Sequence, residues 1–412
     1  MNTSSLLLHP RRLGSLLGFS VIALGALSPA RADFIPTNAG PHDYNTVTNW
    51  DSDTINGVFS KTLTATQAVT FGADTALSTG LAFQYGGAFN MTLRGTGAAR
   101  TITLGGDISL DSVADGRTVT LGSTTVGQEL NITLGASRSI SVAGTDTLKL
   151  LNVVSGNTGI DITKTGAGTL ALDGNNAGNF QGSININAGT VTNNGTFQAA
   201  FGTGVINLGA TSGSADATLR GGGNKAYNTA INIRAGSTGT LTIGHYAGLG
   251  QNGTATFSGA LKIDNNFTVD GGGVGVIVSG AVSSATGGTF ELTKTGAGVV
   301  TWGKDTGNDY SNLTLNIDVT AGTLRAGGGS GTNAFDTKGV VTVSSGATFD
   351  VFNKRPSIGA LVGAGTVTQS TSTSTTSLTL NGVSDAVFTG TLADGSTGGY
   401  NVIKTGSAKQ TL

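Results

Sequence analysis

A seven-residue block occurs three times along the chain, and this repetition limits the possible folds more than any other feature of the sequence. The block reads Ile-Thr-Lys-Thr-Gly-Ala-Gly at residues 162–168 and Leu-Thr-Lys-Thr-Gly-Ala-Gly at residues 292–298. Residues 402–408 form a degraded third copy. A block containing Ala-Gly-Thr follows the first two copies, at residues 187–191 and 320–324. Units that recur in this way stack against their neighbours, so the repetition predicts a solenoid.

Short runs that alternate apolar residues with Thr, Asn or Ser cover the rest of the chain, as at residues 101–104, 183–186 and 377–380. This alternation predicts β-strands, and we expect no helix after Leu27. A short strand cannot bury its apolar face alone, so we expect an all-β fold of stacked parallel coils, a β-helix. With roughly 20–25 residues per coil, the chain after residue 32 makes about 15–19 coils. Arrays of β-sandwiches compete with this prediction, but they are often built around a buried aromatic residue, and only 6% of this chain is aromatic.

Glycine makes up 68 of the 412 residues, more than twice the usual share of about 7%. Glycine suits tight corners that need positive φ, so we expect the repeated glycines at the corners of coils. The repeated lysines are expected to cap a corner or to extend along a coil edge towards solvent, while Thr-Gly makes the turn. The residues assigned to this structural role are Lys164, Thr165, Gly166, Gly168, Gly189, Lys294, Thr295, Gly296, Gly298, Gly322, Lys404, Thr405 and Gly406.

Residues 1–32 have the pattern of a secretory signal peptide. Arg11 and Arg12 precede the apolar stretch 13–27, and Pro-Ala-Arg-Ala then supplies a cleavage site between Ala32 and Asp33. A transmembrane anchor is the alternative, but the apolar stretch is shorter than the about 20 residues that span a bilayer. Removal of residues 1–32, which hold three arginines and no acid, changes the net charge from −1 to −4. No basic block remains for nucleic acid, and the chain has no cysteine for disulfides.

Residues 162–194 resemble the passenger-associated transport repeat, also called the autotransporter-associated β-strand repeat. Residues 292–327 resemble it more loosely, and residues 402–412 resemble its opening half, with Ala408 in place of the second glycine. The resemblance implies a right-handed parallel β-helix that is exported to the cell surface or outside the cell. It divides the chain into a signal peptide (1–32), a capping region with the first coils (33–100) and the passenger β-helix (101–412).

Complete members of that family also carry a C-terminal outer-membrane barrel. Such a barrel needs about a dozen alternating strands of roughly ten residues, and we find no such segment in the sequence. We therefore expect either a fragment of a longer protein, with the barrel encoded beyond Leu412, or a secreted relative that uses the repeat without a barrel.

The chain matches parts of two enzyme motifs, but each match lacks a residue that the chemistry requires. Lys-Thr-Gly belongs to the serine β-lactamase signature, but it occurs three times and no S-x-x-K nucleophile accompanies it. Residues 298–304 match the start of a phosphate-binding loop, but Asp305 stands where the hydroxyl residue is required. No catalytic residue, cofactor or zinc site is expected.

A few polar residues leave alternatives open. Asp264, Asn265, Asn266 and Asp270 could form a weak calcium site, although turns explain them better. The close pairs Asp51/Asp53 and Asp305/Asp309 are the other acidic candidates. We expect His245 to be exposed to solvent, and Trp50, near Tyr44 and Phe59, to cover the first coils.

These patterns predict an exported, non-catalytic β-helix with a structural or adhesive role. Its expected partners are surface carbohydrate or a host or matrix surface. A β-helix polysaccharide lyase or hydrolase is one alternative, and it requires at least three acids and an Arg or Lys in one groove. A spacer stalk for a downstream domain is another. The sequence does not predict an oligomeric state.

Overall fold

The structure is a computed structural model that describes residues 33–51, 57–111, 116–194, 196–246, 253–304, 306–328, 334–371, 376–395 and 399–412. These residues all belong to one compact unit, Ala32–Leu412. The expected signal peptide, including Arg11, Arg12 and Ala32, lies outside the described residues, as do Asp53 and Asp305.

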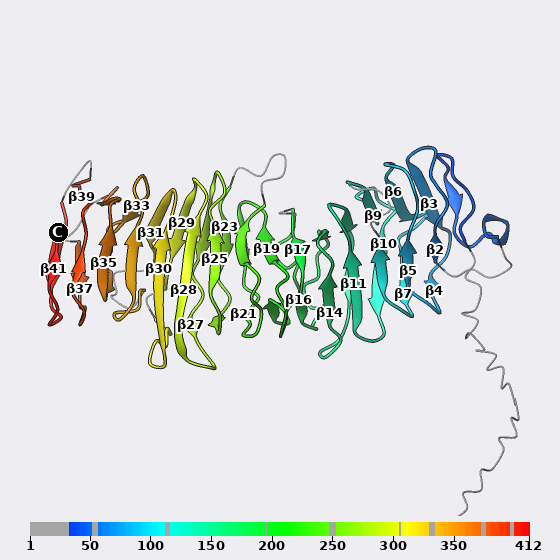
Figure 1. Cartoon of the computed structure of the whole chain (residues 1–412). Helices are drawn as coiled ribbons and strands as arrows, with labels where there is room; N and C mark the ends of the chain where they lie inside the picture. Colours follow the sequence, from blue (N-terminus) through cyan, green and yellow to red (C-terminus); the bar gives the residue numbers. More distant parts are fainter. Residues whose placement is uncertain are drawn as a thin grey trace, which may run out of the picture. The chain divides into compact units, whose positions relative to one another are not determined.

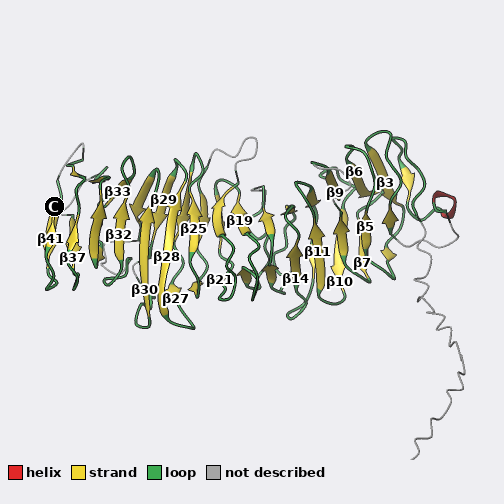
Figure 2. Cartoon of the chain, viewed as in Figure 1, coloured by secondary structure: helices red, strands yellow, loops and turns green. Residues whose placement is uncertain are grey.

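Stacked coils of parallel strands form this unit, which confirms the predicted all-β solenoid. Figure 1 shows the coils in sequence order, from β2 and β3 in blue to β41 in red. Figure 2 shows that strands supply nearly all of its regular structure. The described residues include one short 3-10 helix, η1 (Val47–Asn49), and no helix long and apolar enough to cross a membrane.

The chain passes through three faces in turn, and the second face holds the longest sheet. Fourteen strands form this sheet, in the order β1 (His42–Asp43), β3 (Gln67–Phe71), β6 (Met91–Gly95), β9 (Thr118–Leu121), β12 (Thr147–Leu150), β15 (Thr169–Leu172), β17 (Gly189–Thr192), β19 (Ala217–Gly221), β22 (Leu241–His245), β25 (Phe267–Asp270), β28 (Gly288–Thr295), β30 (Leu313–Val319), β32 (Val340–Val343) and β35 (Ala360–Gly363). A parallel bridge between Gly363 and Phe388 links it to a pair of strands, β38 (Ala386–Val387) and β41 (Gln410–Thr411).

The first face precedes the second in the coils that contain it; between β27 and β34 the strands belong to the second and third faces alone. Its ten-stranded sheet consists of β2 (Val58–Phe59), β5 (Leu81–Phe83), β8 (Ile108–Leu110), β11 (Arg138–Val142), β14 (Ile162–Thr165), β16 (Ile184–Ile186), β18 (Ile206–Leu208), β21 (Ile231–Ile233), β24 (Leu261–Ile263) and β27 (Val282–Ser283). In the last coils a three-stranded sheet takes the same place in the chain order, with β34 (Ser357–Ile358), β37 (Ser377–Leu380) and β40 (Asn401–Lys404).

The third face is divided in two. A four-stranded sheet comes first, with β4 (Thr75–Ala76), β7 (Arg100–Leu104), β10 (Leu130–Leu134) and β13 (Val154–Ser155). An eight-stranded sheet follows, with β20 (Lys225–Tyr227), β23 (Ala255–Phe257), β26 (Gly275–Val278), β29 (Val299–Trp302), β31 (Thr323–Ala326), β33 (Thr348–Asp350), β36 (Thr366–Thr368) and β39 (Thr391–Leu392). The coils between β13 and β20 use two strands instead of three.

Coil length varies more than the sequence predicted. Among the paired residues of the second face, the shortest step along the chain leads from Val343 to Gly363 and the longest from Leu121 to Leu150. The described part of that sheet has 14 strands between His42 and Gly363, whereas 15–19 coils were expected over residues 33–412, and single steps such as the one from Leu121 to Leu150 exceed the length assumed for a coil.

The core is a set of columns, because each inward residue stacks on its partner in the next coil. On the second face one column is fully buried and consists of Val119, Leu148, Leu170, Val191, Leu219, Ile243, Val269 and Lys294. The strands alternate buried and partly exposed residues, as the period-two pattern predicts.

Aromatic side chains close the N-terminal end of this core. The ring of Trp50 lies edge-on to Phe34 and Tyr44, with centroids 5.2 and 5.0 Å apart, and its indole nitrogen donates a hydrogen bond to the Tyr44 carbonyl. Phe59 and Phe83 continue the cluster as a stacked pair. Trp50 is thus buried against the first coils, in the place that the sequence predicted.

Candidate functional site

Lys164 and Lys294 cap their corners from inside the solenoid, which is one of the two positions expected from the sequence, and they do not extend to solvent. Both side chains are fully buried. The ammonium group of Lys164 donates to three backbone carbonyls at 2.7, 2.6 and 3.1 Å, those of Thr165, Gly166 and Ala188. That of Lys294 donates at 2.8, 2.6 and 2.8 Å to the carbonyls of Thr295, Gly296 and Ala321.

Strand register explains this burial. Lys164 stands between Ile140 and Ile186 in an inward column of the first face. Lys294 stands between Val269 and Val319 in an inward column of the second face. Each side chain therefore enters the core and reaches the corner from inside, where carbonyl oxygens replace water. Two of the three acceptors lie in the lysine's own corner and the third in the next coil, so the lysine ties two coils together.

The remaining repeat residues form the corners around these lysines. Thr165 and Thr295 end β14 and β28, Gly166 and Gly296 adopt positive φ (72° and 73°), and Gly168 and Gly298 stand immediately before β15 and β29. The first copy turns from the first face to the second, whereas the second copy turns from the second face to the third. One motif therefore serves two different corners of the coil.

Gly189 shows why the Ala-Gly block accompanies the repeat. Its φ is 72°, and a Cβ atom there would lie 2.4 Å from the carbonyl oxygen of Gly166 and 2.5 Å from that of Gly168. Gly322 stands in the same relation to Gly296 in the second copy, with φ 64° and a distance of 2.5 Å. The Ala-Gly corner of each following coil therefore lies directly on the corner that holds the lysine.

The third copy differs because no described coil follows it. Lys404 pairs with Leu380 and so occupies an inward column, but its side chain is exposed. Its ammonium group donates to the carbonyl of Gly406, in its own corner. The hydroxyl of Thr405 donates to Asn381 at 3.1 Å.

Burial shifts the ionisation of the enclosed lysines. It lowers the pKa of Lys164 from 10.5 to about 7 and that of Lys294 to about 8, and the charge of Asp270 opposes the decrease at Lys294. Above about pH 7, the folded chain therefore releases protons that the unfolded chain retains up to about pH 10.5.

This difference predicts that the solenoid becomes more stable as the pH rises. Because the unfolded state binds more protons, the free energy of unfolding should increase between about pH 7.5 and about pH 9.5, by up to about 1.4 kcal/mol per pH unit for each lysine. Urea titrations at several pH values measure this change. The Lys164→Met/Lys294→Met double variant is the control and should lose the increase. An equal slope in both proteins would contradict the assignment.

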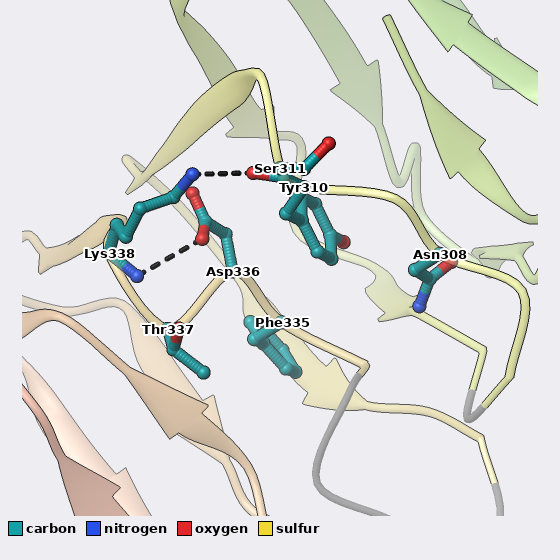
Figure 3. Close-up of a pocket in the computed structure, with 7 residues that line it drawn as sticks. All are labelled: Asn308, Tyr310, Ser311, Phe335, Asp336, Thr337 and Lys338. Carbon is teal, nitrogen blue, oxygen red and sulfur yellow. Dashed lines mark hydrogen bonds between the residues drawn. The ribbon is translucent and has the colours of Figure 1, made fainter.

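A pocket of about 360 Å³ lies near the second repeat, where two outer loops meet. Figure 3 shows the side chains of Tyr310, Phe335, Asp336 and Lys338 around it. Asp336 is 4% exposed, burial raises its pKa, and its carboxylate accepts hydrogen bonds from the backbone amides of Leu315 and Lys338. The ammonium group of Lys338 donates to the Tyr310 carbonyl at 2.5 Å.

The described lining of this pocket holds fewer acids than the three expected of a polysaccharide-active enzyme. Asp336 is the one acid among its described lining residues. Asp309 accepts a hydrogen bond from the Ser311 amide at 3.0 Å within its own exposed turn. Glycoside hydrolysis needs a pair of facing carboxyl groups, and the described residues of the lining supply one carboxyl group, beside a lysine that is hydrogen-bonded to the Tyr310 carbonyl.

The four residues considered for calcium are engaged elsewhere. The Oδ1 atom of Asp264 accepts from the amides and hydroxyls of the 284–286 turn at 2.8–3.1 Å, and Asp270 pairs with Arg220 at 3.1 Å. Asn265 donates to two backbone carbonyls, and Asn266 accepts from the Glu291 amide. Within the described ranges, no group of three or more His, Asp or Glu side chains is arranged to hold a metal ion. Their hydrogen bonds place them in turns and coil contacts.

His245 is buried, which corrects the expectation of an exposed side chain. It is 1% exposed, and its Nε2 atom lies 2.8 Å from the carbonyl oxygen of Gly253. It ends β22, where the neighbouring Gly244 leaves room for the Arg220 guanidinium to cross to Asp270. This packing between coils keeps His245 from a surface role.

Sequence reasoning also missed a buried ion pair in the early coils. Arg117 and Asp146 are both fully buried, with Nη2 of Arg117 2.6 Å from Oδ2 of Asp146. The guanidinium lies over the Tyr85 ring at 4.8 Å and donates to the Tyr85 carbonyl at 2.6 Å. A single Arg and a single Asp one coil apart are the only sequence signal of this pair.

A column of threonines runs along the outside of the second face. Eight consecutive strands of the sheet, from β9 to β28, each place a partly exposed threonine in register with the next: Thr118, Thr147, Thr169, Thr190, Thr218, Thr242, Thr268 and Thr293. Neighbouring members lie about 4.8 Å apart, the spacing of paired strands. On the first face, Asn185, Asn207 and Asn232 form a shorter column joined by amide hydrogen bonds of 2.9 Å.

No protein-family model, curated protein or solved structure matches this chain. The functional argument therefore rests on the geometry of these columns, corners and loops.

Proposed function

We propose that this chain is an exported β-solenoid with an adhesive role, and that its outer surface binds extended carbohydrate. The threonine column carries the proposal. It offers uncharged hydroxyl groups at a constant spacing on eight successive strands. A polysaccharide also presents hydroxyl groups at a constant repeat, so one weak contact is made many times along the two partners.

The threonine column predicts which side chains matter for binding. The triple variant Thr218→Val, Thr242→Val and Thr268→Val keeps the shape of each side chain and removes three hydroxyls. We expect its affinity for an insoluble polysaccharide such as cellulose or chitin to fall about tenfold or more, since each lost hydrogen bond contributes about 0.5–1.5 kcal/mol. Pull-down isotherms of the purified chain measure this effect.

A matched control lies on another face. Thr101, Thr103 and Thr133 occupy outward positions of the four-stranded sheet, and their replacement by valine should leave binding unchanged. If the parent chain binds none of the polymers tested, the adhesive proposal fails and the spacer role gains support. Turnover of a polymer that disappears in Asp336→Asn would favour the enzymatic alternative.

Export is the second part of the proposal, and the basic, apolar and small-residue regions of residues 1–32 support it. We expect the exported protein to begin at Asp33, because cleavage follows Ala32. Intact-mass measurement of protein recovered outside the cytoplasm tests this. The Ala32→Leu variant should still carry residues 1–32, because its cleavage site is lost. The control variant Ala26→Leu should be cleaved after Ala32 like the parent chain. Recovery of exported protein that still carries residues 1–32 would contradict the prediction.

A further inference from the structure

The pocket in Figure 3 lies where the first face of the solenoid is interrupted. Between β27 and β34 the chain passes twice from the third face to the second without a first-face strand, through loops that include residues 306–312 and 334–339. Residues of these two loops line the pocket of about 360 Å³. Pockets that hold small ligands have volumes of about 300–1,000 Å³, so this interruption of the coil pattern leaves room for a small molecule.

Hydrogen bonds hold the two loops in place. The Asn308 side chain accepts from the Val282 amide at 3.0 Å, and the Asp309 amide donates to the Val282 carbonyl at 2.8 Å, which ties the first loop to β27. The Tyr310 hydroxyl donates to the Ala334 carbonyl at 3.3 Å and so joins the first loop to the second. The pocket is therefore preformed, and a ligand does not have to order these loops when it binds.

The lining combines aromatic surface with hydrogen-bonding groups. The Tyr310 side chain is partly exposed, and the buried Phe335 ring is held edge-on against Phe349, with centroids 5.6 Å apart. Lys338 and Thr337 are exposed beside them. Among the described residues, the Lys338 ammonium group donates to the Tyr310 carbonyl, which leaves two of its three donors for a ligand.

The charges around the pocket favour a neutral ligand. Each oxygen of the Asp336 carboxylate accepts one backbone amide, from Leu315 or Lys338, and a carboxylate oxygen can accept a second hydrogen bond. Lys338 is close enough to both Asp309 and Asp336 for its charge to act on them. An anion would therefore meet two carboxyl groups and a cation would meet the ammonium group. Donors and acceptors beside an aromatic ring suit an uncharged ring that carries several hydroxyl groups.

We propose that this pocket binds a single neutral sugar residue, with its ring against Tyr310 and its hydroxyl groups bonded to Lys338 and Asp336. The pocket is separate from the threonine column, because none of its described lining residues belongs to that column. The column contacts the side of an extended polymer, whereas the pocket takes one sugar residue, as a chain end or a side branch presents it. Either site can therefore bind without the other.

Titration calorimetry of the full chain with D-glucose, D-galactose, D-mannose and N-acetyl-D-glucosamine tests the proposal. We expect saturable binding of at least one of these sugars, with a Kd of about 0.1–10 mM, as a few hydrogen bonds provide. Lys338→Met removes the donors and should weaken binding about tenfold. Thr337→Tyr fills the pocket and should abolish binding. Both residues are exposed, so both variants should fold like the parent chain, as circular dichroism would show.

Two controls separate this pocket from other effects. Lys304→Met removes an exposed lysine that is not among the described lining residues and should leave the sugar affinity unchanged. The triple variant Thr218→Val, Thr242→Val and Thr268→Val should also bind the sugar like the parent chain. Three results would each overturn the proposal: no saturable binding of these sugars up to about 50 mM, equal affinities of Lys338→Met and the parent chain, or tighter binding of D-glucuronate or inorganic phosphate. Polymer binding without sugar binding would overturn the pocket alone and leave the threonine column supported.

Discussion

Replacement of Lys164 with methionine is expected to lower the free energy of unfolding by about 2–4 kcal/mol at neutral pH. Methionine keeps most of the side-chain volume but leaves the carbonyls of Thr165, Gly166 and Ala188 without the ammonium group to which they are bonded. A buried acceptor left without a partner costs about 1–3 kcal/mol. Loss of three such bonds therefore outweighs the relief of no longer burying a charge.

Lys404 provides the matched control for this experiment. It belongs to the same motif but is exposed, so Lys404→Met should change the free energy of unfolding by less than about 0.5 kcal/mol. Urea unfolding followed by circular dichroism measures both variants. Lys294 lies several coils away from Lys164, so the losses of unfolding free energy in Lys294→Met and Lys164→Met should add. An unchanged or increased stability of Lys164→Met would mean that the ammonium group does not hold the two coils together.

Replacement of Arg117 with methionine is expected to have a similar or larger effect, a loss of about 3–5 kcal/mol. The change leaves the Asp146 carboxylate in the core without its guanidinium partner, and both residues are fully buried in the parent chain. It also removes the guanidinium from the Tyr85 carbonyl, to which it donates at 2.6 Å.

A second substitution distinguishes the loss of the charge pair from general damage to the core. Asp146→Asn removes the charge but keeps an oxygen for the Arg117 backbone amide, which is bonded to Oδ1 at 2.8 Å. The Arg117→Met/Asp146→Asn double variant should therefore regain the larger part of the lost stability, and thermal and urea unfolding would both report it. If the two substitutions prove additive, the ion pair is not the source of the effect.

The sequence was most informative where one strand or one corner decides the structure. Period-two alternation predicted strands such as β10, whose residues are alternately buried and partly exposed. The repeated glycines marked corners because the backbone at Gly166 and Gly189 needs positive φ. These features depend on near neighbours along the chain.

The same alternation favours the inward, capping position of Lys164 over the solvent-exposed one. Ile162 and Lys164 alternate with Thr163, so they share a face of the strand, and Ile162 is buried. The sequence left both positions open, because the carbonyl oxygens that replace water come partly from Ala188, in the next coil. Contacts between coils likewise decide the pairing of Arg117 with Asp146. Such partners cannot be assigned before the length of each coil is known, and that length differs from one coil to the next.

The number of residues between paired strands varies from coil to coil, so the length of the outer loops can change during evolution. Paired strands stay in register on the second face whether the connecting chain is short or long. Insertions and deletions in an outer loop therefore leave the stacking of the coils intact, provided that the strands and inward columns are kept. The solenoid can acquire new loops one at a time without a new core for each.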